Sequence, residues 1–299
     1  MMRRVLLIAN PNAGRGNMER RRQAIEHFCE LLKHREVDVE VRLTAGPNDA
    51  TQIAKEAVAA GFKEVIASGG DGTINEVLQG LIGSNTRLSI WPRGTANVVA
   101  RELRLPHQLS RLADVIAEGR FQRVHVGCAT AEGRKLVRYF LLMAGIGTDA
   151  TIVGRVRPAL KKRFGEAAFW YSGIETFARW KPTSFIIEAD GRKHSVTFAA
   201  IGKAPHYGGK LGITPRARMD QPEFEVCLIH SVHRRRYLRL LHYAAFGGIP
   251  EKAKDVSFLR TTTVRAYGEG VQAQVDGELI GPLPISFSIS PHSIELISV

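Results

Sequence analysis

The chain has 299 residues, of which 44% are hydrophobic, a length that suggests two domains. It contains no apolar run near the roughly 20 residues that a membrane-spanning helix needs, and its three cysteines lie far apart without a CxxC pair. These features argue against a membrane span or a disulfide framework, so we expect a soluble protein of the reducing cytoplasm. The net charge of +13 favours an anionic partner without deciding among nucleotide, nucleic acid and acidic lipid.

The first third of the chain alternates short apolar runs with helical periodicity. Four buried strands are predicted there: residues 4–9, 37–43, 64–67 and 88–91. Helices are expected between them, the second at residues 48–60. One face of the first helix is expected to carry Ala24, Ile25, Phe28, Leu31 and Leu32. Repeated strand–helix units indicate a parallel sheet with helices on both faces, in which ligands bind beyond the carboxyl ends of the strands.

Each of these predicted strands is followed by a turn that contains glycine. The turns are residues 10–16, 44–46, 68–73 and 92–97. Since the carboxyl ends of parallel strands meet at one edge of a sheet, we expect the turns to converge on a nucleotide cleft, with Thr95 capping the helix that follows. Four unrelated turns are the alternative interpretation.

The sequence from Ser68 to Glu76, Ser-Gly-Gly-Asp-Gly-Thr-Ile-Asn-Glu, joins a predicted strand to a helix. Its glycines let the backbone approach a ligand closely, and the N–H groups at the helix start form an anion site, so phosphate is the expected ligand. A purely structural interpretation is also open, because Thr73 and Glu76 have the spacing of a capping box and Asp71 is a common turn residue.

From about residue 122 the pattern changes to short runs separated by turn signals, which predicts a β-sandwich. The predicted strands are residues 124–129, 135–143, 184–189, 195–201, 224–230, 262–266, 271–275 and 285–289. The expected domains are therefore residues 1–122 and 123–299, with the last strand able to return to the first domain.

Two predicted helices in the second half carry clustered basic residues. The first, residues 165–180, follows Arg155, Arg157, Lys161, Lys162 and Arg163. The second places Arg234, Arg235, Arg236 and Arg239 beside a stripe of Tyr and Leu. A basic amphipathic helix can lie on an anionic membrane, each basic residue contributing roughly 1 kcal/mol. A solvated helix face packed on the sandwich is the alternative.

With these turns identified, the sequence resembles the diacylglycerol kinase catalytic-domain family, which includes bacterial soluble lipid kinases and the sphingosine and ceramide kinases. The matching segments occur in the family's order and span essentially the whole chain: Asn10-Pro11-Asn12-Ala13-Gly14, Gly69-Gly70-Asp71-Gly72-Thr73-Ile74-Asn75-Glu76-Val77, Gly94-Thr95-Ala96-Asn97 with Ala100-Arg101, Ala144-Gly145-Ile146-Gly147, and Val275-Asp276-Gly277-Glu278. Gly-Gly-Asp-Gly-Thr alone is shared with NAD kinases.

The resemblance implies an ATP- and Mg²⁺-dependent lipid kinase, with a Rossmann-like α/β nucleotide domain and a β-sandwich lipid domain across a cleft. It makes Glu278 the general base for the lipid hydroxyl and gives Asp71 the task of organising metal and phosphates, a division suited to phosphoryl transfer. A solvated hairpin is the alternative for Asp276 and Glu278, because Asp276-Gly277 is a good turn. The implied ATP-binding residues are Asn10, Asn12, Gly14, Thr44, Gly69, Gly70, Asp71, Gly72, Thr73, Glu76, Gly94, Thr95 and Asn97.

Three positions depart from the family pattern. Val98, His125 and Gln221 stand where relatives carry Asp. An amide or imidazole is a poorer ligand for a hard cation than a carboxylate. We therefore do not expect the auxiliary magnesium site of bacterial relatives to be intact, whereas we still expect Mg·ATP as the phosphoryl donor.

The leading hypothesis is a cytoplasmic kinase that docks transiently on the membrane and phosphorylates diacylglycerol, phosphatidylglycerol or a related lipid. NAD kinase is one alternative, and a weakly catalytic, ATP-binding regulatory protein at the membrane is another. Nucleic-acid binding is not expected, because no aromatic–basic readout motif accompanies the charge. The oligomeric state and the lipid stay open.

Overall fold

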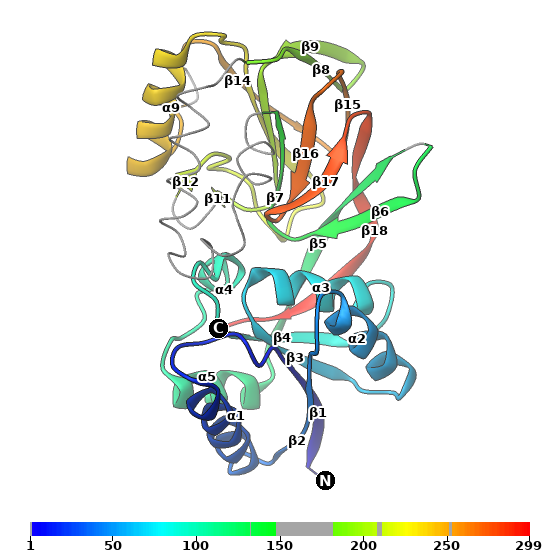
Figure 1. Cartoon of the computed structure of the whole chain (residues 1–299), viewed down its shortest axis with the longest axis vertical. Coiled ribbons are helices and arrows are strands. Elements are labelled where there is room, and N and C mark those ends of the chain that lie inside the picture. Colours follow the sequence, from blue (N-terminus) through cyan, green and yellow to red (C-terminus); the bar gives the residue numbers. More distant parts are fainter. Residues whose placement is uncertain (1, 132, 148–181, 208–210, 251–252) are drawn as a thin grey trace. The chain divides into compact units, whose positions relative to one another are not determined.

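Figure 1 shows the chain as a computed structural model, which describes residues 2–131, 133–147, 182–207, 211–250 and 253–299. The chain divides into two compact units, Met1–Val124 with His292–Val299 and His125–Pro291. The predicted combination of a Rossmann-like unit and a β-sandwich is confirmed. Two strands belong to both units, since β5 (Phe121–Ala131) begins in the first and β18 (Ile285–Ile297) ends there.

A parallel sheet forms the centre of the first unit. Its strands run in the order β2-β1-β3-β4, with the end of β18 pairing in parallel with β4 at Leu296 and Leu88. Their bounds are β1 (Arg3–Ala9), β2 (Val37–Leu43), β3 (Glu64–Gly69) and β4 (Arg87–Pro92). Every residue of β3 is buried, as expected for a central strand covered on both faces.

Among the described residues, five helices surround this sheet: α1 (Met18–Lys33), α2 (Asp49–Ala59), α3 (Asp71–Leu81), α4 (Val98–Glu102) and α5 (Leu109–Glu118). In Figure 1, α2 and α3 lie on one side of the strands, and α1 and α5 lie on the other. Gly80 lets α2 and α3 approach closely, because a Cβ there would lie 2.5 Å from the carbonyl oxygen of Thr51. The sheet is therefore covered on both faces, as the strand–helix alternation predicts.

The second unit is a sandwich of antiparallel strands. One sheet has the order β14-β13-β10-β7-β16-β17, and the start of β18 continues the other through β15, β8 and β9, with β5 pairing β18 and β6. The bounds of the first sheet are β14 (Val256–Thr261), β13 (Phe224–Ile229), β10 (Phe198–Gly202), β7 (Met143–Gly147), β16 (Gln272–Val275) and β17 (Glu278–Pro282). Those of the second are β15 (Thr263–Tyr267), β8 (Phe185–Ala189), β9 (Arg192–Val196) and β6 (Leu136–Phe140).

Aromatic side chains fill the core between these sheets. Phe140 stacks on Phe224 with ring centroids 5.8 Å apart and meets Phe287 edge-on at 6.5 Å. A Cβ at Gly127 would lie 2.2 Å from the Phe140 ring, so the glycine makes room for it. A short pair, β11 (His206–Tyr207) with β12 (Leu211–Gly212), and helix α9 (Arg234–Phe246) complete the described part of this unit.

Several predicted element boundaries differ from the structure. The predicted strands 135–143 and 195–201 each form two strands, and the second break is at Thr197, whose backbone N–H donates to Ile229. The last strand, which we expected to end at residue 289, runs on to Ile297. Helix α5 and strands β14 and β17 were not predicted. The expected helix 165–180 and the basic residues before it lie outside the described residues.

Candidate functional site

The four predicted turns begin side by side at the carboxyl edge of the parallel sheet. Three backbone hydrogen bonds tie the beginnings of these turns to neighbouring strands: Asn10 N–H to Ser68 (2.9 Å), Thr44 N–H to Ala9 (3.0 Å) and Arg93 N–H to Gly69 (2.7 Å). The turns are therefore neighbours in space, although they are far apart in the sequence. The alternative of four unrelated turns does not hold.

Two of these turns touch through glycines. A Cβ on Gly94 would lie 2.5 Å from the Cα of Gly70, and a Cβ on Gly69 would lie 2.4 Å from the hydroxyl of Thr73. Neither position has room for a side chain. Gly72 is different, because no atom among the described residues lies within 4 Å of a Cβ placed there. The glycines thus pack the turns together and leave open space beside the start of α3.

Helix α3 begins at Asp71, so the capping-box interpretation is wrong. Its N-cap is Gly70, which has no side chain, whereas Thr73 is the third helical residue and Glu76 lies a turn further in. Thr73 instead accepts a hydrogen bond from the side-chain amide of Asn10 (3.4 Å). The first N–H groups of a helix have no intrahelical partner, and the helix dipole adds positive charge there. The start of α3 is therefore suited to an anion.

Asp71 caps a neighbouring helix. Its Oδ1 accepts the backbone N–H of Val99 in α4 at 3.1 Å, across 28 residues of sequence. Burial raises the pKa of Asp71 above its ordinary value of 3.8, while the N–H groups of Val99 and Val98 and the charge of Arg101 act in the opposite direction. Asp71 thus joins the glycine turn to helix α4, which follows the 92–97 turn. Its identity as a common turn residue did not predict this contact.

Asn97, and not Thr95, closes the 92–97 turn. Asn97 has a left-handed backbone (φ 49°) and is the N-cap of α4, without a side-chain cap hydrogen bond. Its side chain accepts the N–H of Gly94 and donates to the carbonyl of Gly94, both at 2.8 Å. The expectation that Thr95 caps this helix is wrong, and Thr95 is exposed at the tip of the turn. Its hydroxyl is therefore available to a ligand.

The first turn is held by its asparagine. Asn10 Oδ1 accepts the N–H of Asn12 (2.9 Å), which leaves the Asn12 side chain exposed. Gly14 has φ +99°, and a Cβ there would meet the guanidinium of Arg93 at 2.8 Å. That guanidinium also lies over the Trp91 ring, 4.7 Å from its centroid. Arg93 of the 92–97 turn therefore packs against the 10–16 turn, a contact that sequence reasoning missed.

Glu278 lies in the second unit, directly after a tight hairpin turn. Val275 pairs with Glu278, and Asp276 (φ 46°) and Gly277 (φ 83°) form the two-residue turn, as predicted. Asp276 is not a solvated turn residue, however. Its carboxylate accepts the backbone N–H groups of Leu141 (2.8 Å), Leu142 (3.0 Å) and Met143 (3.0 Å). The hairpin is thereby fixed to the segment between β6 and β7.

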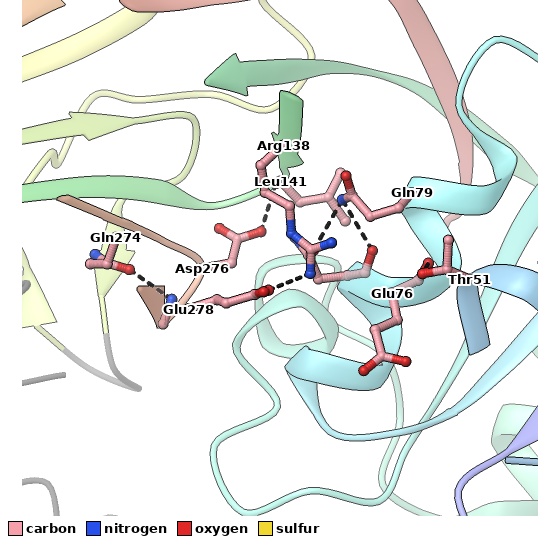
Figure 2. Close-up of polar contacts among 10 residues, drawn as sticks. Thr51, Glu76, Gln79, Arg138, Leu141, Gln274, Asp276 and Glu278 are labelled. Atoms are coloured by element: carbon pink, nitrogen blue, oxygen red, sulfur yellow. Dashed lines mark hydrogen bonds and ion pairs between the residues drawn. The ribbon is translucent and has the colours of Figure 1, made fainter. Parts of the chain in front are cut away.

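Arg138 of β6 forms an ion pair with Glu278 (Figure 2). The Arg138 side chain is 15% exposed and that of Glu278 is 52% exposed, so the pair has one anchored and one accessible partner. The sequence offers no local signal for the contact, because the two residues are 140 positions apart. That Glu278 and Asp71 face each other across one cleft stays a prediction.

Helix α9 exposes a face that carries both basic and apolar side chains. Its exposed residues include Arg235, Arg239, Leu238 (52%) and Phe246 (80%). Arg236 departs from the expected arrangement, because its Nε lies 3.2 Å from Asp255. On its inner face, Tyr237 shares a hydrogen bond of 2.6 Å with Thr197. The side chain of Arg234 lies outside the described residues.

Within the part of the chain that the structure describes, no group of three or more His, Cys, Asp or Glu side chains could hold a metal ion. At Gln221, the ammonium of Lys203 lies against the backbone carbonyl instead. These residues do not fit the auxiliary magnesium ion. In addition, none of the described helices is long and apolar enough to cross a membrane.

Comparison with known proteins identifies both units. The family model described as "Diacylglycerol kinase catalytic domain" matches residues 4–129, and "YegS C-terminal NAD kinase beta sandwich-like domain" matches residues 143–298. A diacylglycerol kinase of Mycobacterium tuberculosis is 28% identical over 298 residues, covering 98% of this chain and 94% of its own. One of Bacillus subtilis is 28% identical, covering 96% and 93%. The crystal structure of a diacylglycerol kinase from Bacillus anthracis has the same fold (TM-score 0.76, 20% identity), covering 99% and 97%.

Proposed function

Since this chain belongs to the diacylglycerol kinase catalytic-domain family and is a lipid kinase, we propose that it transfers the γ-phosphoryl group of Mg·ATP to a hydroxyl of diacylglycerol or a similar lipid, such as phosphatidylglycerol. The convergence of four glycine-containing turns at one sheet edge is the observation that supports ATP as the phosphoryl donor. Such an edge is where nucleotides bind to open α/β sheets.

The nucleotide phosphates bind at the start of α3 in this proposal. The open space beside Gly72 admits them, and the helix N-terminus attracts their charge. Thr44, Thr73, Thr95 and Asn12 supply polar groups around them. Asp71 organises the magnesium that accompanies ATP. Its bond to Val99 uses one acceptor position of a carboxylate that has about four.

Glu278 is the general base for the lipid. It takes the proton of the lipid hydroxyl as the hydroxyl oxygen forms a bond to the γ-phosphorus, while the bond from that phosphorus to the β,γ-bridging oxygen breaks and ADP leaves. Arg138 orients the carboxylate, and Asp276 fixes the hairpin that carries it. A half-exposed carboxylate on a fixed hairpin can reach an incoming substrate, which supports this role for Glu278.

Membrane contact is assigned to helix α9. Leu238 and Phe246 are exposed apolar side chains that can enter the lipid interface, and Arg235 and Arg239 can meet anionic headgroups. Each basic residue near such a surface contributes about 1 kcal/mol. Arg236 is excluded from this set because of its ion pair with Asp255.

The test is transfer of label from γ-labelled ATP to a panel of lipids in mixed micelles, with NAD in a parallel reaction. We expect labelled diacylglycerol or a related lipid and no NADP, and we expect Asp71→Asn and Glu278→Gln to lose transfer. Labelled NADP would establish an NAD kinase. ATP binding and vesicle association without any turnover would establish a regulatory protein instead. Full activity in both variants would refute the assigned roles.

A further inference from the structure

Lys203 is a fully buried cation in the core of the second unit. It directly follows β10, and its side chain is 0% exposed. Its backbone N–H donates to the carbonyl of Leu142 at 2.8 Å, which fixes where the side chain begins. A buried ammonium is unfavourable unless hydrogen bonds and nearby charges replace its hydration. The groups around its tip therefore indicate what the lysine does.

Three backbone carbonyls surround the ammonium. Lys203 Nζ donates to the carbonyl oxygens of Arg218 (3.1 Å), Glu223 (3.2 Å) and Gln221. An ammonium has three N–H donors, so each one has an acceptor. Burial lowers the pKa of Lys203 to about 8, while the charges of Asp220 and Glu223 act in the opposite direction. The group is therefore a cation at neutral pH.

The three acceptors come from one turn, residues 218–223, which leads into β13. The turn is also tied to β5, because the carbonyl of Met219 accepts the N–H of His125 at 2.9 Å. Two of the three positions that depart from the family pattern, His125 and Gln221, thus meet at this turn. Backbone carbonyls with a carboxylate are typical ligands of a hard divalent ion. Here the carbonyls are present, but an amide stands in place of the carboxylate.

The ammonium of Lys203 and the neutral amide at Gln221 compensate each other in charge. A divalent ion beside one carboxylate leaves one net positive charge, and an ammonium beside a neutral amide leaves the same. A metal ion and the ammonium would compete for the same oxygens and repel each other. We propose that the ammonium of Lys203 is the resident cation of the 218–223 turn, so that this chain holds the turn in place without a divalent metal.

The proposal is tested by thermal unfolding at neutral pH, without nucleotide, in an excess of EDTA and in an excess of MgCl₂. The wild-type protein should have the same Tm in both buffers and should contain no stoichiometric metal by elemental analysis. Lys203→Met, which keeps the length of the side chain but has no donors, should unfold roughly 5 °C or more lower in both buffers. Lys193→Met, at an exposed lysine of β9, is the control and should match the wild-type protein.

A double variant, Lys203→Ser with Gln221→Asp, tests the exchange directly. It removes the ammonium and places a carboxylate at position 221 of the same turn. Gln221 and Glu223 also line a surface pocket of about 260 Å³, together with Arg216, Arg218 and Arg260. Magnesium should raise the Tm of this variant and EDTA should reverse the gain.

Three results would overturn the proposal. They are a fall of the wild-type Tm in EDTA, a wild-type Tm for Lys203→Met, and a double variant that does not respond to magnesium. The EDTA comparison and the metal content use only the wild-type protein. They therefore decide the question even if the variants fail to fold.

Discussion

The carboxylate of Asp71 accepts the backbone N–H of Val99 at 3.1 Å, so the residue assigned to the metal and phosphates also caps helix α4. This double use has an energetic consequence. Burial raises the pKa of Asp71, which means that the folded protein binds the proton more tightly than the unfolded chain. Stability contributed by Asp71 therefore falls as pH rises from 3.8 through the raised pKa of the folded state.

Asp71→Asn should separate stability from catalysis. The amide oxygen can still accept the N–H of Val99, and the buried charge is gone, so the Tm at neutral pH should equal or exceed that of the wild-type protein. Phosphoryl transfer should fall about 100-fold or more, because the carboxylate that we propose organises the magnesium is replaced by an amide. The check is Tm against pH together with the lipid-kinase assay. The Tm advantage should shrink in acid, where wild-type Asp71 is protonated, and a large loss of Tm at neutral pH would contradict this account.

Gly94→Ala and Gly72→Ala form a matched pair. The first places a methyl group 2.5 Å from the Cα of Gly70, so it should lower the free energy of unfolding by about 1–3 kcal/mol and weaken ATP binding. The methyl group of Gly72→Ala meets no described atom within 4 Å outside its own stretch of helix. Because residue 72 is helical, this substitution should raise the free energy of unfolding by up to about 1 kcal/mol. Urea unfolding and ATP titration measure both quantities.

If the space beside Gly72 holds phosphates, Gly72→Ala should nevertheless weaken ATP binding. The combination of raised stability and weakened binding is specific to a ligand site. Unchanged ATP affinity in Gly72→Ala would place the phosphates elsewhere.

Sequence patterns predicted those features that depend on neighbouring residues. The apolar run of β3 follows from burial on both faces, and the Asp276–Gly277 turn follows from the left-handed angles that these residues tolerate. Convergence of the four turns followed from a general property of parallel sheets. Helix α5 also carried a readable signal, since its buried Leu112, Val115 and Ile116 have helical spacing, and this signal was missed.

The remaining features depend on side chains brought together by folding. The partners of Glu278 and Lys203 are fixed only when strands distant in sequence pair, so no local pattern contained them. The exposed strand β17 has no hydrophobic alternation to reveal it. The capping-box prediction failed for a different reason. The spacing of Thr73 and Glu76 was correct, but the N-cap is Gly70, three residues before Thr73, and the helix begins at Asp71.

Arg138 is a positioning residue in our proposal, and substitution should affect turnover rather than nucleotide binding. Arg138→Met leaves Glu278 without its ion-pair partner and should lower kcat about 10- to 100-fold, with the KM for ATP unchanged. Arg138→Lys keeps the charge and should recover part of kcat. Steady-state kinetics with the preferred lipid provide the measurement. Equal losses in both variants, or a loss confined to the KM for ATP, would argue against positioning.

Membrane docking through α9 should depend on both its apolar and its basic residues. Leu238→Ser with Phe246→Ser removes side chains that are 52% and 80% exposed, so folding loses little, whereas each apolar side chain withdrawn from lipid costs about 1.5–3 kcal/mol of binding. Arg235→Gln with Arg239→Gln should weaken binding only to anionic vesicles, and added salt should reduce the difference.

Co-sedimentation with vesicles of phosphatidylcholine, with and without phosphatidylglycerol, measures this binding for each variant. Met18→Ser is the matched control, because Met18 is 78% exposed on α1 in the first unit. The control should bind as the wild-type protein does. If the α9 variants also bind at the wild-type level, docking does not use this helix. If the arginine variant loses binding equally to neutral and anionic vesicles, its effect is not electrostatic, and the assignment of Arg235 and Arg239 to headgroups is wrong.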